Sequence, residues 1–188
     1  MLEAAAELFG LNGYKATTIA QIEKAAGLSP GSGGLYRHFP SKKALLHESL
    51  KRQVDSGPDL SRYMSPPADP DDIRSQLRAI AQAGLRRLEH ERDLNRLLLR
   101  DLRDFPDLLA MVRDTELRRV HDGLTRWLGA NGGAGALDPA TVAAILMGAV
   151  SHYWIMSDVY GGTHPFHPHE DDFLTALADM TASALRRG

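Results

Sequence analysis

Apolar side chains recur every three to four residues along almost the whole chain, which is the spacing of one face of an α-helix. In the N-terminal part this pattern predicts four short helices, over residues 2–11, 18–25, 30–38 and 41–53. No strand and no internal repeat are predicted. The fold class expected from the pattern is therefore all-α.

Turn-forming residues interrupt the helical pattern after the fourth of these helices. The breakers are Ser56-Gly57-Pro58 and the Pro-rich stretch 65–70, which bracket a short segment. We therefore predict a domain boundary here, with one domain over residues 1–53 and another over residues 54–188. In the second domain the apolar period predicts helices over residues 71–105, 106–128, 139–160 and 169–186.

The second and third predicted helices are separated by a tight turn. Thr17 or Thr18 can cap the first of them through its hydroxyl, and Gly27 supplies the backbone freedom that a sharp turn requires. Ser29 and Pro30 then restart the helix, with Ser as the N-cap and Pro at the first helical position. Two short helices joined in this way are typical of a helix-turn-helix DNA reader.

The residues around this pair resemble the N-terminal domain of the tetracycline-repressor (TetR) family of transcriptional regulators. The resemblance rests on Thr17–Ser29 and Gly34–Leu45, preceded by Leu2–Phe9 and Asn12–Thr18. It implies an N-terminal three-helix helix-turn-helix DNA-binding domain and a C-terminal helical ligand-binding and dimerisation domain. The printed sequence begins inside the first helix, so no basic arm is expected before it.

The third predicted helix departs from the family pattern, because Ser32-Gly33-Gly34 makes this segment longer than usual. If a helix spans residues 30–38, the face opposite Leu35 and Phe39 carries Pro30, Gly33, Gly34 and Arg37. Alternatively, the extra residues lie in the turn, the helix starts near Gly33, and Ser32 caps it. Arg37 is the main candidate for reading a guanine edge.

The resemblance also implies contacts with DNA phosphates. The residues in the matching positions are Thr18, Tyr36, His38 and Lys42. Each also has a physical reason, because helix N-termini offer free N–H groups to phosphate and because Tyr, His and Lys are hydrogen-bond donors. Together with Ser32, Gly33 and Arg37 they form the predicted DNA-binding set. The alternative for Tyr36 and His38 is ordinary surface packing.

Charge is unevenly distributed along the chain. The formal net charge is only −2, which by itself does not indicate nucleic acid. Residues 1–53, however, carry seven Lys and Arg against four Asp and Glu, and they contain all five lysines. This distribution favours a phosphate-facing domain attached to an acidic one. The alternative is an accident of composition.

Aromatic and methionine side chains concentrate in the second domain. Most such stripes form plain core, but the mixed stretch Ser151–Trp154 suits an apolar pocket with a few polar groups. With the resemblance, this composition predicts a pocket for a small, largely apolar effector. Its predicted lining is Phe105, Trp127, Met147, His152 and Trp154. No cofactor is expected.

The last two predicted helices have the composition of a subunit interface. Residues 142–160 are apolar on all sides, and Ala144, Gly148 and His152 lie on one face where another helix can approach closely. A helix that is apolar on all sides must be covered on all sides. We therefore predict a homodimer through the last two helices, and the resemblance implies a two-fold four-helix bundle.

Several other classes of site and location are not favoured. The chain has no cysteine, and Gly27–Gly31 fits the nucleophile-elbow pattern without the strand that such an elbow needs. His164, His167 and His169 do not have the spacing of a known metal site, so no metal is predicted. The longest apolar run has nine residues, whereas a membrane span needs about 20. With no signal peptide, the protein is expected in the cytoplasm, away from membranes.

These observations predict a ligand-responsive transcriptional regulator, a repressor in most members of the family, and not an enzyme. A dimer would place two reading helices about 34 to 36 Å apart on a palindromic double-stranded DNA operator, and a bound effector would release it. The helix over residues 41–53 is the expected lever, since it alone would join the reader to the rest. The alternatives are a small helical enzyme or metal-binding protein with an incidental helix-turn-helix, and an effector-free DNA binder.

Overall fold

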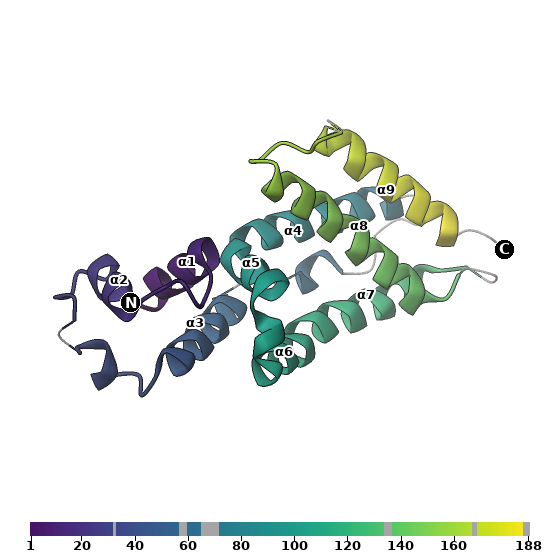
Figure 1. Cartoon of the computed structure of the whole chain (residues 1–188). Helices are drawn as coiled ribbons and strands as arrows, with labels where there is room; N and C mark the ends of the chain where they lie inside the picture. Colours follow the sequence, from purple (N-terminus) through teal and green to yellow (C-terminus); the bar gives the residue numbers. More distant parts are fainter. Residues whose placement is uncertain (32, 57–59, 65–71, 134–136, 167–168, 186–188) are drawn as a thin grey trace. The chain divides into compact units, whose positions relative to one another are not determined.

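The computed structural model describes the whole chain except residues 32, 57–59, 65–71, 134–136, 167–168 and 186–188. The regular elements within the described residues are helical (Figure 1), and none of those residues forms a strand. The expectation of an all-α fold is confirmed. The chain forms two compact units, the first from Met1–Gly57 with Glu91–Glu116 and the second from Pro58–His90 with Leu117–Gly188.

The first unit contains short helices from two separate parts of the chain. The N-terminal part has α1 (Leu2–Asn12), α2 (Ile19–Ala25), the 3-10 turn η1 (Leu35–Arg37) and α3 (Lys42–Ser56). The later part has α5 (Arg92–Arg100), the 3-10 turn η4 (Leu102–Asp104) and α6 (Pro106–Val112). Helix α1 packs against both α3 and α5. The two parts therefore share one apolar core, made of Ala5, Phe9, Ile22, Leu35, Leu45, Leu46, Leu50, Leu94, Leu97, Leu102, Leu108 and Val112.

This unit is larger than the domain 1–53 that the turn-forming residues predict. Residues 91–116 are part of it because their leucines pack in the core described above. The apolar period indicates that these leucines share a helix face, but it does not indicate which core that face joins. The expectation that residues 41–53 alone connect the helix-turn-helix to the rest is wrong, since the chain enters this unit again at residue 91.

The predicted helix over residues 30–38 is wrong. Only the single turn η1 forms there, and Gly31 and Gly33 adopt positive φ angles of 76° and 68°. A residue with a left-handed backbone cannot continue a right-handed helix, and glycine adopts that conformation without a steric penalty. The alternative that places the extra residues in the turn is nearer to the structure. Its proposed cap, Ser32, lies outside the described residues.

Two of the longer predicted helices are divided in the structure. Helices α4 (Ile73–His90) and α5 are separated at Glu91. Helices α6 and α7 (Arg118–Asn131) are joined by a π-helical turn over Arg113–Leu117. Because the apolar period runs through both junctions, it gives no signal for either interruption.

The second unit is built from longer helices around its own core. It contains the 3-10 turn η2 (Ser61–Tyr63), α4, α7, α8 (Pro139–Val159) and α9 (Glu170–Leu185). Helix α8 packs against α4, α7 and α9, and α4 also packs against α9. The predicted start of α8 is confirmed, because the Asp138 carboxylate accepts a hydrogen bond from the Thr141 backbone N–H at 2.9 Å.

By length and composition alone, α8 is apolar enough to cross a membrane, with a mean hydropathy of 1.3. Core helices of soluble proteins meet the same criterion. In this structure Val142, Leu146 and Val150 of α8 lie buried in the core of the second unit. The apolar character of the helix is thus accounted for in part by packing within the chain.

Candidate nucleic-acid interface

The start of α2 is defined by a reciprocal pair of hydrogen bonds. The Thr18 hydroxyl accepts from the Gln21 backbone N–H at 3.2 Å, and the Gln21 side-chain oxygen accepts from the Thr18 backbone N–H at 2.7 Å. This capping box allows a helix of only seven residues to begin at a defined position. Of the two threonines that the sequence offers as caps, Thr18 is therefore the one used, and it remains exposed at the end of α2.

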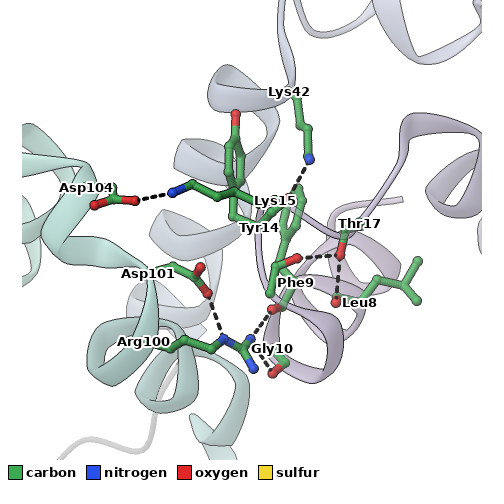
Figure 2. A network of polar contacts seen from close by, with 11 residues as sticks. Leu8, Phe9, Gly10, Tyr14, Lys15, Thr17, Lys42, Arg100, Asp101 and Asp104 are labelled. Atoms are coloured by element: carbon green, nitrogen blue, oxygen red, sulfur yellow. Dashed lines mark hydrogen bonds and ion pairs between the residues drawn. The ribbon is translucent and has the colours of Figure 1, made fainter.

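Thr17 has a different role from its neighbour. Its side chain is buried, and its hydroxyl donates to the carbonyl oxygens of Leu8 at 2.9 Å and Gly13 at 2.8 Å. These contacts attach the turn between α1 and α2 to the end of α1 (Figure 2). The position of α2 thus depends on a buried hydroxyl as well as on apolar packing.

The predicted DNA-reading residues after α2 share one exposed turn. Leu35 is buried in the core, whereas Tyr36, Arg37 and His38 are exposed on η1 and just after it. The exposed fraction of Tyr36 is 55%, so its hydroxyl is available to a partner. Gly33 is half-buried, and a Cβ built on it would meet no atom within 4 Å. The structure therefore brings four of the seven predicted residues together, next to α2.

Lys42 is the predicted phosphate contact that the structure places differently. Its ammonium donates to the Tyr14 carbonyl oxygen and lies 4.3 Å from the centroid of the Tyr14 ring (Figure 2). Partial burial lowers the pKa of Lys42 through desolvation. Such a cation holds the turn after α1 and is not directed outward for phosphate binding. The neighbouring Lys43 is exposed, and the sequence reasoning missed it.

Two exposed lysines of this unit form ion pairs with acidic residues near η4 and α6. The Lys15 ammonium lies 2.9 Å from Asp104, and the Lys43 ammonium lies 2.8 Å from Asp107. Hydrogen bonding to the lysines holds the pKa of both carboxyl groups below its usual value. Exposed pairs of this kind contribute little to stability. They do, however, place carboxylates beside lysines on the unit that carries the helix-turn-helix.

Arg100 attaches α5 to the C-terminal end of α1. Its Nη2 donates to the carbonyl oxygens of Phe9 at 2.9 Å and Gly10 at 3.0 Å, and its Nε donates to Asp101 at 2.9 Å (Figure 2). The last carbonyls of a helix lack partners within the helix, so a cation there satisfies them and complements the helix dipole. No local sequence signal indicates this contact, because the residues are about 90 positions apart.

Three of the five predicted effector-binding residues, Trp127, Met147 and Trp154, belong to the core of the second unit. Trp127 and Trp154 are 4% and 6% exposed there, and the half-buried Met147 packs against this core. The Trp154 indole N–H donates to the Glu89 carboxylate at 3.1 Å. His152 is exposed on α8. Phe105 packs in the core of the first unit, edge-on to Tyr14.

The histidine loop after α8 takes part in an aromatic stack. The ring of Tyr153 lies between His164 and Phe173, with centroid separations of 5.0 and 4.4 Å. His164 is buried and accepts a hydrogen bond from the Phe166 backbone N–H, whereas His169 is exposed. His167 lies outside the described residues. Within the part of the chain that the structure describes, no group of His, Asp and Glu is arranged to hold a metal.

The last two helices expose apolar side chains at the surface of the second unit. Ile145 of α8 is 60% exposed, and Met180 of α9 is 72% exposed. A Cβ built on Gly148 would meet no atom within 4 Å. Leu177, by contrast, is buried within the chain.

The fold and the exposed turn beside a capped helix define a helix-turn-helix protein with a second, helical unit. Residues 1–49 match the family model described as bacterial regulatory proteins, tetR family. This N-terminal part of the chain is thus similar to the DNA-binding part of TetR-family regulators. The predicted resemblance to this family is confirmed for the N-terminal part.

Curated relatives match the N-terminal part of the chain. The transcriptional repressor KstR2 of Rhodococcus jostii is 40% identical over 81 residues, which are 43% of this chain and 37% of the relative. KstR2 of Mycolicibacterium smegmatis is 42% identical over 55 residues, which are 29% of this chain and 26% of the relative. The chain thus matches 37% and 26% of the length of these two repressors.

Solved structures resemble the chain over nearly its full length. AibR, solved in complex with isovaleryl coenzyme A and operator DNA, superposes with a TM-score of 0.71 at 20% identity, covering 95% of this chain and 94% of AibR. The TetR-family regulator PfmR from Thermus thermophilus superposes with a TM-score of 0.68 at 24% identity, covering 99% and 98% of the two chains. At these identities the likeness demonstrates the fold.

Proposed function

We propose that this protein is a ligand-responsive transcriptional repressor. A dimer binds a palindromic operator, and a small apolar effector releases it. The observation that carries the proposal is the exposed turn Tyr36–His38, which follows α2 in a segment that matches the family. Its relatives KstR2 are described as repressors.

The chemistry of the exposed turn suits DNA. Arg37 offers the donors that read a guanine edge, while Tyr36 and His38 can donate to phosphates on either side. The free N–H groups at the start of α2 add a further phosphate site beside the exposed Thr18. Because the structure turns Lys42 inward, we assign the nearby phosphate contact to Lys43.

The partner chain in the proposed dimer covers the outer faces of α8 and α9. Ile145 and Met180 expose apolar side chains there, and Gly148 leaves room for a neighbouring backbone. Introducing a charge at this surface, as in Ile145→Glu, should convert the dimer to a monomer in light-scattering measurements. Arg126→Glu, on the exposed side of α7, is the matched control that should remain a dimer.

The proposed effector site lies in the second unit, near Trp154 and Glu89. An indole held by a carboxylate offers an apolar wall and one polar group, which is typical of small-molecule sites. The first compounds to test are short acyl thioesters, because AibR was solved with isovaleryl coenzyme A. A repressor of chromosomal operators acts inside the cell, and we assign the protein to the cytoplasm.

The decisive experiment selects an operator from a random-sequence DNA library and then titrates it with and without effector candidates. We expect a palindromic site, an affinity that falls steeply with salt, and release by at least one acyl compound. Because binding free energies are linked reciprocally, quenching of tryptophan fluorescence and DNA release should share one concentration range. Selection of no preferred sequence would refute the proposal.

A second candidate, an effector-free DNA binder, is favoured by one observation. Trp127 and Trp154 are both almost fully buried in the core of the second unit. In that case an operator would be selected, but no compound would change its affinity. His152→Ala separates the two candidates, since it should shift the release midpoint only if an effector binds near α8.

A further inference from the structure

Glu23 is a carboxylate without any exposed surface in the middle of the helix-turn-helix. It lies on α2, and its exposed fraction is 0%. A charged side chain is almost never fully buried unless it is paired or hydrogen-bonded, because burial removes its hydration. The sequence pattern does not single it out, since a polar residue in a short helix is ordinarily solvated. Its burial therefore calls for a structural partner.

The partners of Glu23 are backbone N–H groups of the segment that replaces the expected helix. Oε2 accepts from the Gly31 N–H at 2.7 Å, and Oε1 accepts from the Leu35 N–H at 3.3 Å. Both carboxylate oxygens are thus engaged, on residues 8 and 12 positions further along the chain. Hydrogen bonds to a charged acceptor are about twice as strong as those between neutral groups.

These two contacts fix the part of the chain that carries the exposed turn. Leu35 is the first residue of η1, so its N–H has no partner within that turn. Gly31 has a left-handed backbone, and its N–H donates to Glu23 on α2. The segment here is longer than the family pattern and glycine-rich, and it has no helix to hold it. The Glu23 carboxylate supplies the missing attachment.

We propose that Glu23 is a positioning residue for DNA reading: it sets the place of Tyr36, Arg37 and His38 by binding the backbone on both sides of the glycine-rich stretch. This inference rests on the proposed DNA-binding function. Glu23 itself does not touch DNA, because it is buried. Its contribution is mainly to operator selectivity, since the base contact of Arg37 depends on this segment, whereas the phosphate contacts at Thr18 and Lys43 do not.

If this carboxylate is removed, electrostatics and positioning predict opposite changes in operator affinity. Removing a negative charge from a DNA-binding surface should by itself strengthen binding to all DNA. If Glu23 positions the reading turn, Glu23→Gln should instead weaken binding to the operator, because one N–H would face an amide donor rather than an oxygen. Glu7→Gln, on the exposed side of α1, removes the same charge and is the matched control.

The first readout is amide exchange, which needs no DNA. In Glu23→Gln we expect the exchange of the Gly31 and Leu35 amides to rise about tenfold or more, because a buried donor loses its acceptor. The Ala26 amide, which donates to Ile22 within α2, should keep its wild-type rate. Unchanged exchange at Gly31 and Leu35 in the folded variant would overturn the inference. Glu23→Asp, which keeps the charge but is one methylene shorter, should give an intermediate rate.

The second readout is the ratio of operator to random-DNA affinity. We expect Glu23→Gln to lower operator affinity about tenfold and random-DNA affinity by clearly less, because Tyr36 and His38 lie on the displaced turn while Thr18 and Lys43 do not. Equal loss on both DNAs, or no loss on the operator, would overturn the role in reading. If the wild-type protein selects no operator, the proposed function fails, and the attachment by Glu23 is then judged on amide exchange alone.

Discussion

Each of the two units of this molecule is stabilised internally by a different kind of contact. In the first unit, short helices and irregular turns are fixed by the buried or half-buried polar groups of Thr17, Glu23 and Lys42, and by the exposed Arg100. In the second unit, four long helices pack around an apolar core through residues such as Leu128, Leu146 and Leu174. Helices as short as α2 bury little surface and gain little from cooperativity, so hydrogen bonds must set their position. The unit that carries the exposed turn Tyr36–His38 is therefore one in which polar contacts set the position of short elements.

The largest loss of stability is expected from a cavity made in the apolar core of the second unit. Leu128 has no exposed surface on α7, and Leu128→Ala should lower the free energy of unfolding by about 2 to 5 kcal/mol. Arg126→Ala, an exposed neighbour on the same helix, should change it by less than about 0.5 kcal/mol. Chemical denaturation measures both. Similar values for the two variants would show that the core of the second unit is not packed as described.

A smaller loss of stability is expected where α1 and α5 of the first unit approach each other closely. A Cβ on Gly10 of α1 would lie 2.3 Å from Oδ1 and 2.6 Å from Cβ of Asp93 on α5. Gly10→Ala should therefore cost about 1 to 3 kcal/mol, despite the better helix propensity of alanine.

Gly129 on α7 is the matched control, because its added Cβ would meet only Pro139 at 3.6 Å. Gly129→Ala should raise the free energy of unfolding by up to about 1 kcal/mol. Thermal melting of both variants tests the pair. Stabilisation by both substitutions would contradict the close contact between α1 and α5.

The exposed turn and the lysine beside it should affect DNA binding in different ways. Arg37→Ala should cost about 1 to 3 kcal/mol on the operator and relax its sequence preference. Lys43→Ala should weaken binding to every DNA and reduce the salt slope by about one. Lys42→Ala should lower stability instead, because its ammonium binds the Tyr14 carbonyl. Salt titrations on operator and random DNA distinguish the three, and identical effects of Arg37→Ala and Lys43→Ala would refute their assignments.

The smallest expected effect is a pH dependence of stability that arises from one ion pair in the first unit. The pKa of Asp104 is lowered by its hydrogen bond to Lys15 and then by the lysine charge. A carboxyl whose pKa is lower in the folded state adds stability above its unfolded-state pKa, and this contribution disappears as pH falls through the folded-state value. The gap in melting temperature between wild type and Asp104→Asn should therefore be small near neutrality and vanish in acid. A gap that widens in acid would contradict the ion pair.

The local features of this chain were predictable from its sequence. Thr18 caps α2, and Asp138 with Pro139 starts α8, because caps depend on residues within one helical turn of each other. The family was predictable for the same reason, since its motif is contiguous. The predicted helix over residues 30–38 failed because Gly31 and Gly33 are left-handed, and the Gly31 N–H binds a carboxylate on α2 rather than a carbonyl within a helix.

The sequence by itself determined the all-α class, the helix-turn-helix and the apolar character of the last two helices, because these depend on periodicity and neighbouring residues. Only the tertiary structure decided that residues 91–116 join the first unit, that Arg100 binds the end of α1, and that Lys42 turns inward. These contacts join positions far apart in the chain, and a helical period specifies an apolar face without specifying its partner. Where each charged side chain lies therefore depends on which element its helix packs against.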